Sequence, residues 1–404
     1  MILRHFSPSR TLIVAPASVL ENWRRETKRW LSEDAAIFSS GKGKFDREAA
    51  IVITSYDGLK KIEYQPEMLI LDESHYIKNH KAQRTIAALE KARRCKWVLA
   101  LTGTPLLNRP AELWTSWQAV QPSTCPGWWA YARRYCAAYE TRYGWDVSGA
   151  SNTDELQKML HTFMLRRKKS EVLQELPPIT RRVVPLRPHA PSPFLEKLRE
   201  IAKSGKRINS ELRTSLMQDA LQEFHDNAEI KSKIPEFTDY ITNTLEQQNG
   251  DKLVIFAKHI VLIEAISGIL RTNSVGHVVI TGETKVEERQ TLIDRFSTDK
   301  NCRVAVLSLG VGREGLNLQV ASRAIITELD WSPSALAQAE ARLHRIGQQG
   351  NVEITYIVYG QFEDRLYALL AQKAELIAKI VDGQSSDENG KGGFDLLTAL
   401  IDEK

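Results

Sequence analysis

Two adjacent carboxylates, Asp72 and Glu73, follow directly on the apolar run MLIL at residues 68–71. A buried strand that ends in an acidic pair presents both side chains at the carboxyl edge of a parallel sheet, where such sheets bind ligands. Carboxylate oxygens are what a protein usually offers to a hydrated Mg²⁺ ion that also binds phosphate. The pair therefore predicts the metal side of a nucleotide site.

A second group of candidate residues lies in QAEARLHRIGQ, residues 338–348. Gln338, Arg342 and Arg345 are spaced i, i+4 and i+7, which predicts that they share one face of a helix. Guanidinium groups can grip a triphosphate through paired hydrogen bonds, and one can stabilise the charge that develops during phosphoryl transfer. The segment predicts a phosphate-binding face, and the alternative is a solvated arginine face.

The phosphate loop that usually accompanies such residues is missing from the sequence, because no G-K-[ST] occurs in it. The motif G-x-x-x-x-G-K-[ST] wraps the phosphates in backbone amides, neutralises them with its Lys and binds Mg²⁺ through its hydroxyl. The stretch SSGKGKFD, residues 39–46, contains two G-K pairs, but neither is followed by Ser or Thr. We expect that stretch to be an exposed turn.

Short apolar runs alternate with charged helical stretches from residue 11 to about 120, and the pattern returns from about 236. Such runs suit strands buried on both faces of a parallel sheet, with crossover helices between them. The sequence therefore predicts two α/β lobes. The expected strands are TLIVAP (11–16), AIVITS (50–55), MLILD (68–72) and WVLALTG (97–103) in the first lobe, and KLVIFA (252–257), HVVITG (277–282), CRVAVLSL (302–309), RAIITEL (323–329) and VEITYIVY (352–359) in the second.

The region between the lobes is rich in Arg, Tyr and Trp and is interrupted by LPP and by RPHAPSP. Prolines there bound helical segments, and only RRVVPL, residues 181–186, has a strand-like pattern. The predicted division is a first lobe at 1–121, a helical protrusion and linker at 122–235, a second lobe at 236–382 and a flexible tail at 383–404.

The composition is that of a globular protein: 42% of the 404 residues are hydrophobic and 26% are charged. No apolar run is long enough for a membrane span, and the N-terminus does not resemble a secretory signal, so we expect a protein that stays in the cell. Net charge is +5. The basic runs LRRKKSEV (165–172) and TRRVVPLRP (180–188) are either solvated surface or nucleic-acid contacts.

Five motifs occur in a fixed order: LDESH, LALTGTPLLNRPAELW, FMLRRKKSEVLQELPP, REGLNLQVASRAIITELDWSP and QAEARLHRIGQ. In this order they resemble the Swi/Snf-type DNA translocases of helicase superfamily two. ITELDWSPSALAQAEARLHRIGQ and EIKSKIPEFTDYI look most like the annealing-helicase branch. The resemblance covers residues 11 to about 382 and implies two RecA-like lobes with a helical insertion, the first lobe being incomplete because the family's phosphate loop precedes the strand TLIVAP.

The resemblance also implies roles for individual residues. Asp72 would bind the Mg²⁺ of ATP, and Glu73 would orient or deprotonate the attacking water. Nucleotide contacts would come from Gln338, Arg342, Arg345 and the glycine loop at Gly315. The implied DNA contacts are Ser18, Thr102, Gly103, Thr104, Arg166, Arg167, Gly312 and Asn317.

The expected partner is double-stranded or branched DNA, and the expected cofactors are ATP and Mg²⁺. The phosphate loop would come from an upstream segment or from a separate chain. A truncated start is another explanation, and the rival reading of the whole chain is a non-catalytic DNA-binding or interaction remnant of such a motor. A restriction or recombination motor is disfavoured by LPP and HRIGQ. The expected location is the cytoplasm, at the nucleoid in a prokaryote or phage, or the nucleus in a eukaryote.

Overall fold

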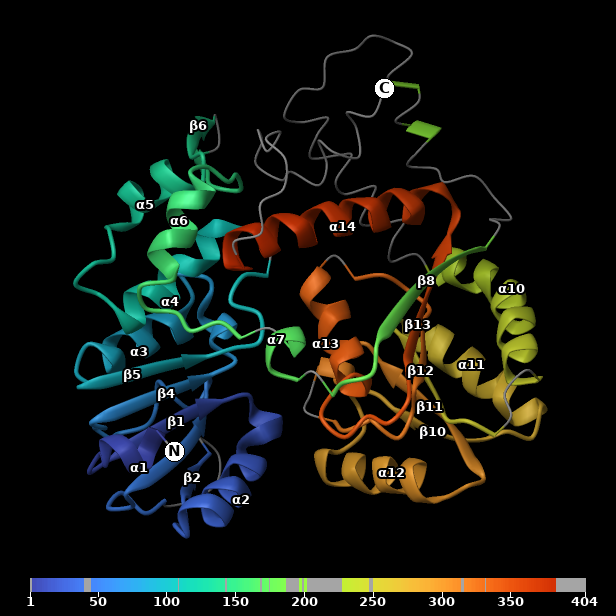
Figure 1. The fold of residues 1–404 in the computed structure, drawn as a ribbon, viewed down its shortest axis with the longest axis horizontal. Helices are drawn as coiled ribbons and strands as arrows, with labels where there is room; N and C mark the ends of the chain where they lie inside the picture. Colours follow the sequence, from blue (N-terminus) through green and yellow to red (C-terminus); the bar gives the residue numbers. More distant parts are fainter. Residues whose placement is uncertain are drawn as a thin grey trace. The chain divides into compact units, whose positions relative to one another are not determined.

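The computed structural model describes residues 2–39, 45–107, 109–141, 144–167, 169–173, 175–186, 196–197, 200–201, 227–246, 250–313, 316–330 and 332–382. The chain divides into two compact units. The first comprises residues up to Arg166 together with the end of the last helix from Glu375, and the second comprises Arg167–Ala374. Figure 1 shows a twisted sheet flanked by helices in each unit.

The first unit is built on a five-stranded parallel sheet in the order β2-β3-β1-β4-β5. Its four predicted strands are confirmed, and the short β2 is an addition that the sequence pattern did not predict. Three of the four predicted strands are buried except at their ends, as expected for continuous apolar runs. The strands are β1 (Thr11–Ala15), β2 (Ala36–Phe38), β3 (Ile51–Ser55), β4 (Met68–Asp72) and β5 (Trp97–Leu101).

Helices cover both faces of this sheet. Side chains of α1 and α2, among them Leu3 and Leu20, pack on the face that contains Ile13 and Ile53. Residues of α3 and α4 pack on the opposite face. The helical elements are α1 (Ile2–Phe6), η1 (Ala17–Val19), α2 (Leu20–Leu31), η2 (Ser74–Ile77), α3 (Gln83–Ala92), η3 (Pro110–Glu112) and α4 (Leu113–Val120).

A small helical subdomain completes the first unit. Its core gathers Trp117 from α4, Tyr131 from α5 and Leu160 from α6, together with Ile380 near the end of α14. A two-stranded antiparallel hairpin lies between α5 and α6 in the sequence. The elements are α5 (Trp128–Tyr135), β6 (Tyr139–Thr141), β7 (Gly144–Asp146), α6 (Thr153–Leu160) and α14 (Gly360–Asp382).

The second unit is built on a six-stranded parallel sheet in the order β10-β11-β9-β12-β13-β8. All five predicted strands of the second lobe are present. The strands are β8 (Ile179–Leu186), β9 (Leu253–Ala257), β10 (Gly276–Ile280), β11 (Cys302–Ser308), β12 (Arg323–Ile326) and β13 (Val352–Tyr359); the helical elements are α7 (Lys169–Val172), α10 (Asn227–Glu246), α11 (Ile260–Thr272), α12 (Val286–Thr298), η4 (Val311–Arg313) and α13 (Pro333–Leu343).

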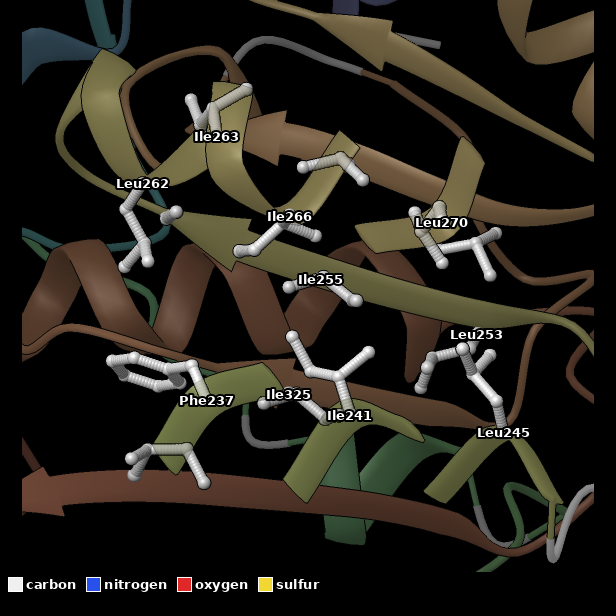
Figure 2. Close-up of a cluster of buried hydrophobic side chains, with 14 residues drawn as sticks. Phe237, Ile241, Leu245, Leu253, Ile255, Leu262, Ile263, Ile266, Leu270 and Ile325 are labelled. Carbon is white, nitrogen blue, oxygen red and sulfur yellow. The ribbon is translucent and has the colours of Figure 1, made fainter. Parts of the chain in front are cut away.

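The main core of the second unit lies between this sheet and the helices α10 and α11 (Figure 2). Phe237 and Ile241 from α10 and Ile263 from α11 are buried against Ile255 and other residues of the central strands. Alternate residues of β9 face this core because side chains of a strand point to opposite sides. The fold is therefore two parallel-sheet α/β lobes, as predicted. Among the described residues, no helix has an apolar stretch long enough to cross a lipid bilayer.

The division into units differs from the predicted domain boundaries, since residues 122–166 and the end of α14 from Glu375 belong to the first unit. The segment RRVVPL, predicted to lie in the helical insertion, belongs to β8, which pairs in parallel with β13 and forms the sixth strand of the second sheet. The boundary predicted between 235 and 236 falls inside α10, which continues through Pro235. Partner-strand pairing and helix packing decide these assignments, and neither is visible in the local pattern. The tail at 383–404 lies outside the described residues.

Candidate functional site

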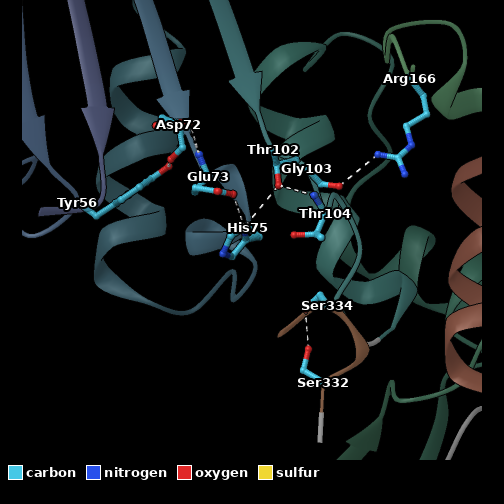
Figure 3. Close-up of polar contacts among 10 residues, drawn as sticks. All are labelled: Tyr56, Asp72, Glu73, His75, Thr102, Gly103, Thr104, Arg166, Ser332 and Ser334. Atoms are coloured by element: carbon cyan, nitrogen blue, oxygen red, sulfur yellow. Dashed lines mark hydrogen bonds and ion pairs between the residues drawn. The ribbon is translucent and has the colours of Figure 1, made fainter. Parts of the chain in front are cut away.

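The acidic pair lies at the carboxyl end of β4, as predicted (Figure 3). Both oxygens of Asp72 accept hydrogen bonds: Oδ2 from Trp23 Nε1 at 2.7 Å, and Oδ1 from the backbone N–H of Glu73 at 3.0 Å. The hydroxyl of Tyr56 donates to the backbone carbonyl of Asp72 at 2.7 Å. These contacts fix the carboxylate in one orientation at the strand end.

Two features of the pair fit a divalent cation. Burial raises the pKa of the Asp72 carboxyl, and the charge of Glu73 adds to the rise, while the hydrogen bond from Trp23 opposes it. A cation at this position would favour the ionised form. Glu73 has a left-handed backbone, with φ 50° and ψ 54°, and among the described residues its buried Oε2 accepts no hydrogen bond, although His75 Nδ1 lies 3.2 Å away. A hydrated Mg²⁺ ion, which keeps several waters and takes one or two carboxylates, suits this donor set.

Polar contacts connect the acidic pair with the TGT loop after β5. His75 Nδ1 lies 3.2 Å from Glu73 Oε2 and 3.4 Å from Thr102 Oγ1. The Thr102 hydroxyl also accepts the backbone N–H of Thr104 at 3.0 Å, which shapes the loop. Figure 3 shows these residues in a row from the end of β4 to the end of β5. One imidazole thus contacts both the Glu73 carboxylate and the Thr102 hydroxyl.

Arg166 is held at the same loop, because its Nη1 donates to the carbonyl oxygen of Gly103 at 3.2 Å. Three residues predicted to contact DNA, Thr102, Gly103 and Thr104, thus lie in one loop, and a fourth, Arg166, contacts that loop. Gly103 is exposed, whereas Thr102 and Thr104 are half-buried. The remaining basic residue of this prediction, Arg167, is exposed and begins the second unit. Their DNA contacts stay predictions.

The arginine segment differs from its prediction. Gln338 and Arg342 lie four residues apart on α13, as predicted, but the helix ends at Leu343, so the placement of Arg345 on the same helical face is wrong. The chain leaves the helical conformation at His344, where φ is −85° and ψ is 80°, and it turns at Gly347, where φ is 97°. The side-chain amide of Gln348 then donates to the carbonyl oxygen of Leu343 at 3.1 Å, which satisfies one of the free carbonyls at the helix end.

A group of cations surrounds the end of α13. Arg342 Nε donates to the carbonyl oxygen of Gly312 at 3.0 Å, and Lys169 Nζ donates to that of His344 at 2.8 Å. The pKa of Lys169 is lowered by burial and then by the charges of Arg342 and Arg345. Positive charge at a helix C-terminus interacts favourably with the helix dipole. The second unit thus holds three cationic side chains, Lys169, Arg342 and Arg345, close together.

Glu340, on the buried side of α13, is the main anchor of this helix. It accepts two hydrogen bonds from Arg181, at 2.7 Å each, and one from the hydroxyl of Tyr356 at 2.7 Å. His344 Nε2 bonds the carbonyl oxygen of Pro177 at 2.8 Å. Arg181 therefore braces the second unit, and at this position the basic run TRRVVPLRP is structural.

The other predicted DNA-binding residues are scattered over both units. Ser18 is half-buried in η1, at the carboxyl end of β1. Gly312 is buried, and a Cβ added there would come within 2.8 Å of the Phe256 ring, so close packing explains its identity. Asn317 is exposed and lines a polar pocket of about 560 Å³. Gly315, predicted to bind nucleotide, lies outside the described residues.

The sequence patterns single out neither Trp23 nor Glu340. Both have a signal in hindsight. An indole N–H is a donor that usually finds a partner when partly buried, and Trp23 lies on the helix that follows the central strand β1. Glu340 lies between apolar residues of a helix, where an ionised carboxylate needs partners.

Comparison with known proteins identifies the family. Residues 4–221 match the SNF2-related domain, and residues 232–347 match the helicase conserved C-terminal domain. The chain is 35% identical to the SWI/SNF-related matrix-associated actin-dependent regulator of chromatin subfamily A-like protein 1 of Xenopus tropicalis, over 91% of this chain and 40% of that protein. It is 31% identical to the DNA annealing helicase and endonuclease ZRANB3 of Homo sapiens, over 96% of this chain and 38% of that protein.

Among solved structures, the SWI2/SNF2 ATPase core of Sulfolobus solfataricus in complex with double-stranded DNA aligns at 24% identity and a TM-score of 0.40, covering 94% of this chain and 84% of that one. The chain spans about 40% of the length of the curated relatives that it matches. The match to the SNF2-related domain covers more than half of the chain and includes the acidic pair and the TGT loop. The chain therefore belongs to the SNF2-related family of helicase-type proteins.

Proposed function

We propose that this chain forms part of an ATP-dependent motor that moves along double-stranded DNA and remodels or reanneals it. The observation that carries the proposal is the row of contacts from Glu73 through His75 to Thr102, because it joins a candidate hydrolytic carboxylate to a loop predicted to contact DNA. A motor needs such a connection, since hydrolysis has to alter the grip on DNA. The name of the human relative, a DNA annealing helicase, supports the same activity.

In this proposal Asp72 holds Mg²⁺, and Trp23 keeps the carboxylate oriented toward it. Bound Mg²⁺ would neutralise charge on the nucleotide phosphates. Glu73 accepts a proton from the attacking water through its carboxylate, whose Oε2 lies 3.2 Å from His75 Nδ1. Gln338, Arg342, Arg345 and Gly315 are assigned to the nucleotide, on the basis of the family and the chemistry of the guanidinium group.

We further propose that hydrolysis needs a phosphate loop from a segment not contained in these residues, supplied from another part of the protein or by a second chain. The edge strand β5 supports the proposal that another segment supplies the phosphate loop. Within the described sheet it pairs only with β4, and all five of its apolar residues are half-exposed. Trp97 N donates toward the β4 side, to the carbonyl oxygen of Glu67. Because directions alternate along a strand, the N–H groups of Val98 and Ala100 point to the open edge.

The position of this edge also suits a phosphate loop. A strand added beside β5 would lie two strand spacings, or about 10 Å, from the strand that carries Asp72. At the opposite edge, beside β2, it would lie four spacings, or about 19 Å, away. Only the β5 edge would bring a loop at the carboxyl end of the added strand near the acidic pair.

The test is DNA-stimulated phosphate release, measured for the chain alone and for the chain joined to a strand, phosphate loop and helix. We expect release from the completed protein and none from the chain alone. No release from a completed, folded protein would contradict the proposal. The rival, a non-catalytic DNA-binding remnant, predicts a DNA affinity that ATP and Mg²⁺ leave unchanged and that falls steeply with salt.

Replacing Trp23 by Phe in the completed protein is expected to raise the Mg²⁺ concentration for half-maximal phosphate release by about tenfold. The reason is the loss of the only N–H that the indole donates to Asp72 Oδ2. Trp30→Phe is a matched control, because Trp30 lies on the same helix, is 63% exposed and donates to the surface residue Glu26. An unchanged Mg²⁺ dependence in Trp23→Phe would show that the indole does not position Asp72.

A further inference from the structure

The hairpin β6–β7 and the neighbouring helix α5 expose aromatic side chains that the proposed ATPase chemistry does not use. Trp129 is 47% exposed, Trp145 is 40% exposed and Tyr139 is 54% exposed. Large aromatic side chains contribute much apolar surface, and several of them gathered on one exposed surface commonly mark a binding site. This group lies in the small helical subdomain of the first unit (Figure 1).

Two of these rings and one cation form a continuous surface. The ring centroids of Trp129 and Trp145 are 5.3 Å apart, with 55° between the ring planes. The guanidinium carbon of Arg133 lies 5.4 Å from the centroid of the Trp145 ring. Trp129 and Arg133 are four residues apart on α5 and so share one face of that helix. We call Trp129, Arg133 and Trp145 the indole platform.

The platform is not needed for the local core. The opposite side of α5 carries the buried residues Tyr131, Ala132 and Tyr135, which pack in the subdomain core. In addition, the Tyr135 hydroxyl bonds Glu155 of α6 at 2.7 Å. Arg134, the neighbour of Arg133, forms an ion pair with the same carboxylate. The helix is therefore fixed from its buried side, and the platform side remains accessible.

The hairpin also holds its residues in a defined register. Trp145 is paired across the strands with Glu140, and Tyr139 with Asp146. The Tyr139 hydroxyl donates to Asp146 Oδ2 at 3.2 Å, and the other oxygen of Asp146 accepts the backbone N–H of Ser148 at 2.7 Å. Little conformational freedom would be lost when a ligand stacks on the exposed indole, and such preorganisation favours binding.

We propose that the indole platform stacks unpaired bases of a DNA substrate, with the Arg133 guanidinium beside them for the phosphate backbone. This inference rests on the proposed function and narrows its substrate to DNA that contains unpaired bases. Base faces are hidden inside a duplex and become available only where strands are single or separated, and there aromatic rings and Arg are the residues that bind them. A paired indole surface flanked by a cation fits that chemistry, because it offers a flat apolar face and a positive charge together.

The test compares the affinity of the 404-residue chain for two fluorescent DNAs, a blunt duplex and the same duplex with unpaired arms. We expect Trp129→Ala/Trp145→Ala to weaken binding of the armed duplex by about tenfold, the scale of one to two lost stacking contacts. Binding of the blunt duplex should stay unchanged. The aromatic variant Trp129→Phe/Trp145→Phe should recover most of the affinity, since Phe retains a ring face.

Two controls make the outcome specific. Trp30→Ala removes another highly exposed indole, on α2, and should leave both affinities unchanged. Circular dichroism of the double variant should match that of the unaltered chain, since both substituted side chains are exposed. Equal binding of the armed duplex by the double variant and the unaltered chain would overturn the platform while leaving the proposed motor intact. If the unaltered chain binds neither DNA, the proposed function fails as well.

Discussion

Replacing Glu73 by Gln is expected to reduce DNA-stimulated phosphate release by about 10²–10⁴-fold in the protein completed with a phosphate loop. The amide has nearly the same shape as the carboxylate but cannot take a proton from water. The backbone at residue 73, with φ 50°, places the side chain in the same way in both proteins. Binding of DNA should remain, because the TGT loop and Arg166 are unchanged.

The matched control for this variant is Glu67→Gln, at the other end of β4. Glu67 accepts hydrogen bonds from Ser9, at 2.8 Å from the backbone N–H and 2.9 Å from the hydroxyl, and an amide oxygen can still accept them. We expect near-normal release from Glu67→Gln. Full release from Glu73→Gln would remove Glu73 from the catalytic assignment and leave His75 as the next residue to examine.

Replacing Lys233 by Met is expected to destabilise the second unit by about 3–5 kcal/mol, the usual cost of removing one partner of a buried ion pair. Lys233 Nζ lies 2.6 Å from Glu363 Oε1, and the two side chains are only 6% and 5% exposed. The pair joins α10 to the first turns of α14. Amide hydrogen exchange in peptides from α10 and β9 measures the free energy of unfolding for this unit.

The destabilisation caused by Lys233→Met should depend on pH. Burial raises the pKa of Glu363, although Lys233 and the backbone N–H of Tyr359 oppose the rise. When the pKa of a carboxyl is higher in the folded state than in the unfolded state, the free energy of unfolding falls as the pH rises. The fall begins near the unfolded-state pKa and ends near the folded-state pKa. Without Lys233 that window extends upward, so we expect a larger destabilisation at pH 8 than at pH 5. An equal loss at both pH values would contradict the role of the buried charge.

Two further variants bracket this prediction. Lys233→Met/Glu363→Leu removes both charges and should recover part of the lost stability, as other buried pairs do when replaced by apolar residues. Lys285→Met removes an exposed lysine whose partner Glu288 lies 4.0 Å away, and it should change stability by less than about 1 kcal/mol. A cost for Lys285→Met equal to that of Lys233→Met would show that burial is not what makes the Lys233 pair important.

Four strands of the first sheet and five of the second could be predicted because each is a continuous apolar run. A strand buried on both faces is apolar at successive positions, and MLILD and KLVIFA are clear instances. β8 is harder to assign, since ITRRVVPL is an edge strand with both exposed and half-buried residues. Its place in the second sheet depends on pairing with β13, more than 150 residues later in the sequence.

The candidate site shows the same division. The position of Asp72 and Glu73 at the carboxyl end of a buried strand could be predicted, because they follow a continuous apolar run. Spacing placed Gln338 and Arg342 on one helix correctly but failed for Arg345, because the backbone leaves the helical conformation at His344. Periodicity alone does not show where a helix stops.

By itself, the sequence determined the two α/β lobes, the acidic pair at the end of β4 and the membership of a family. Strand burial and motif order can be read from residues that are close together in the sequence. Only the tertiary structure decided that Trp23 bonds Asp72, that Arg181 braces Glu340 and that Trp129 lies against Trp145. Each of these contacts joins residues from different elements, and the side-chain types at either end are compatible with many other partners. Packing selects one partner for each, and that selection is a property of the folded chain.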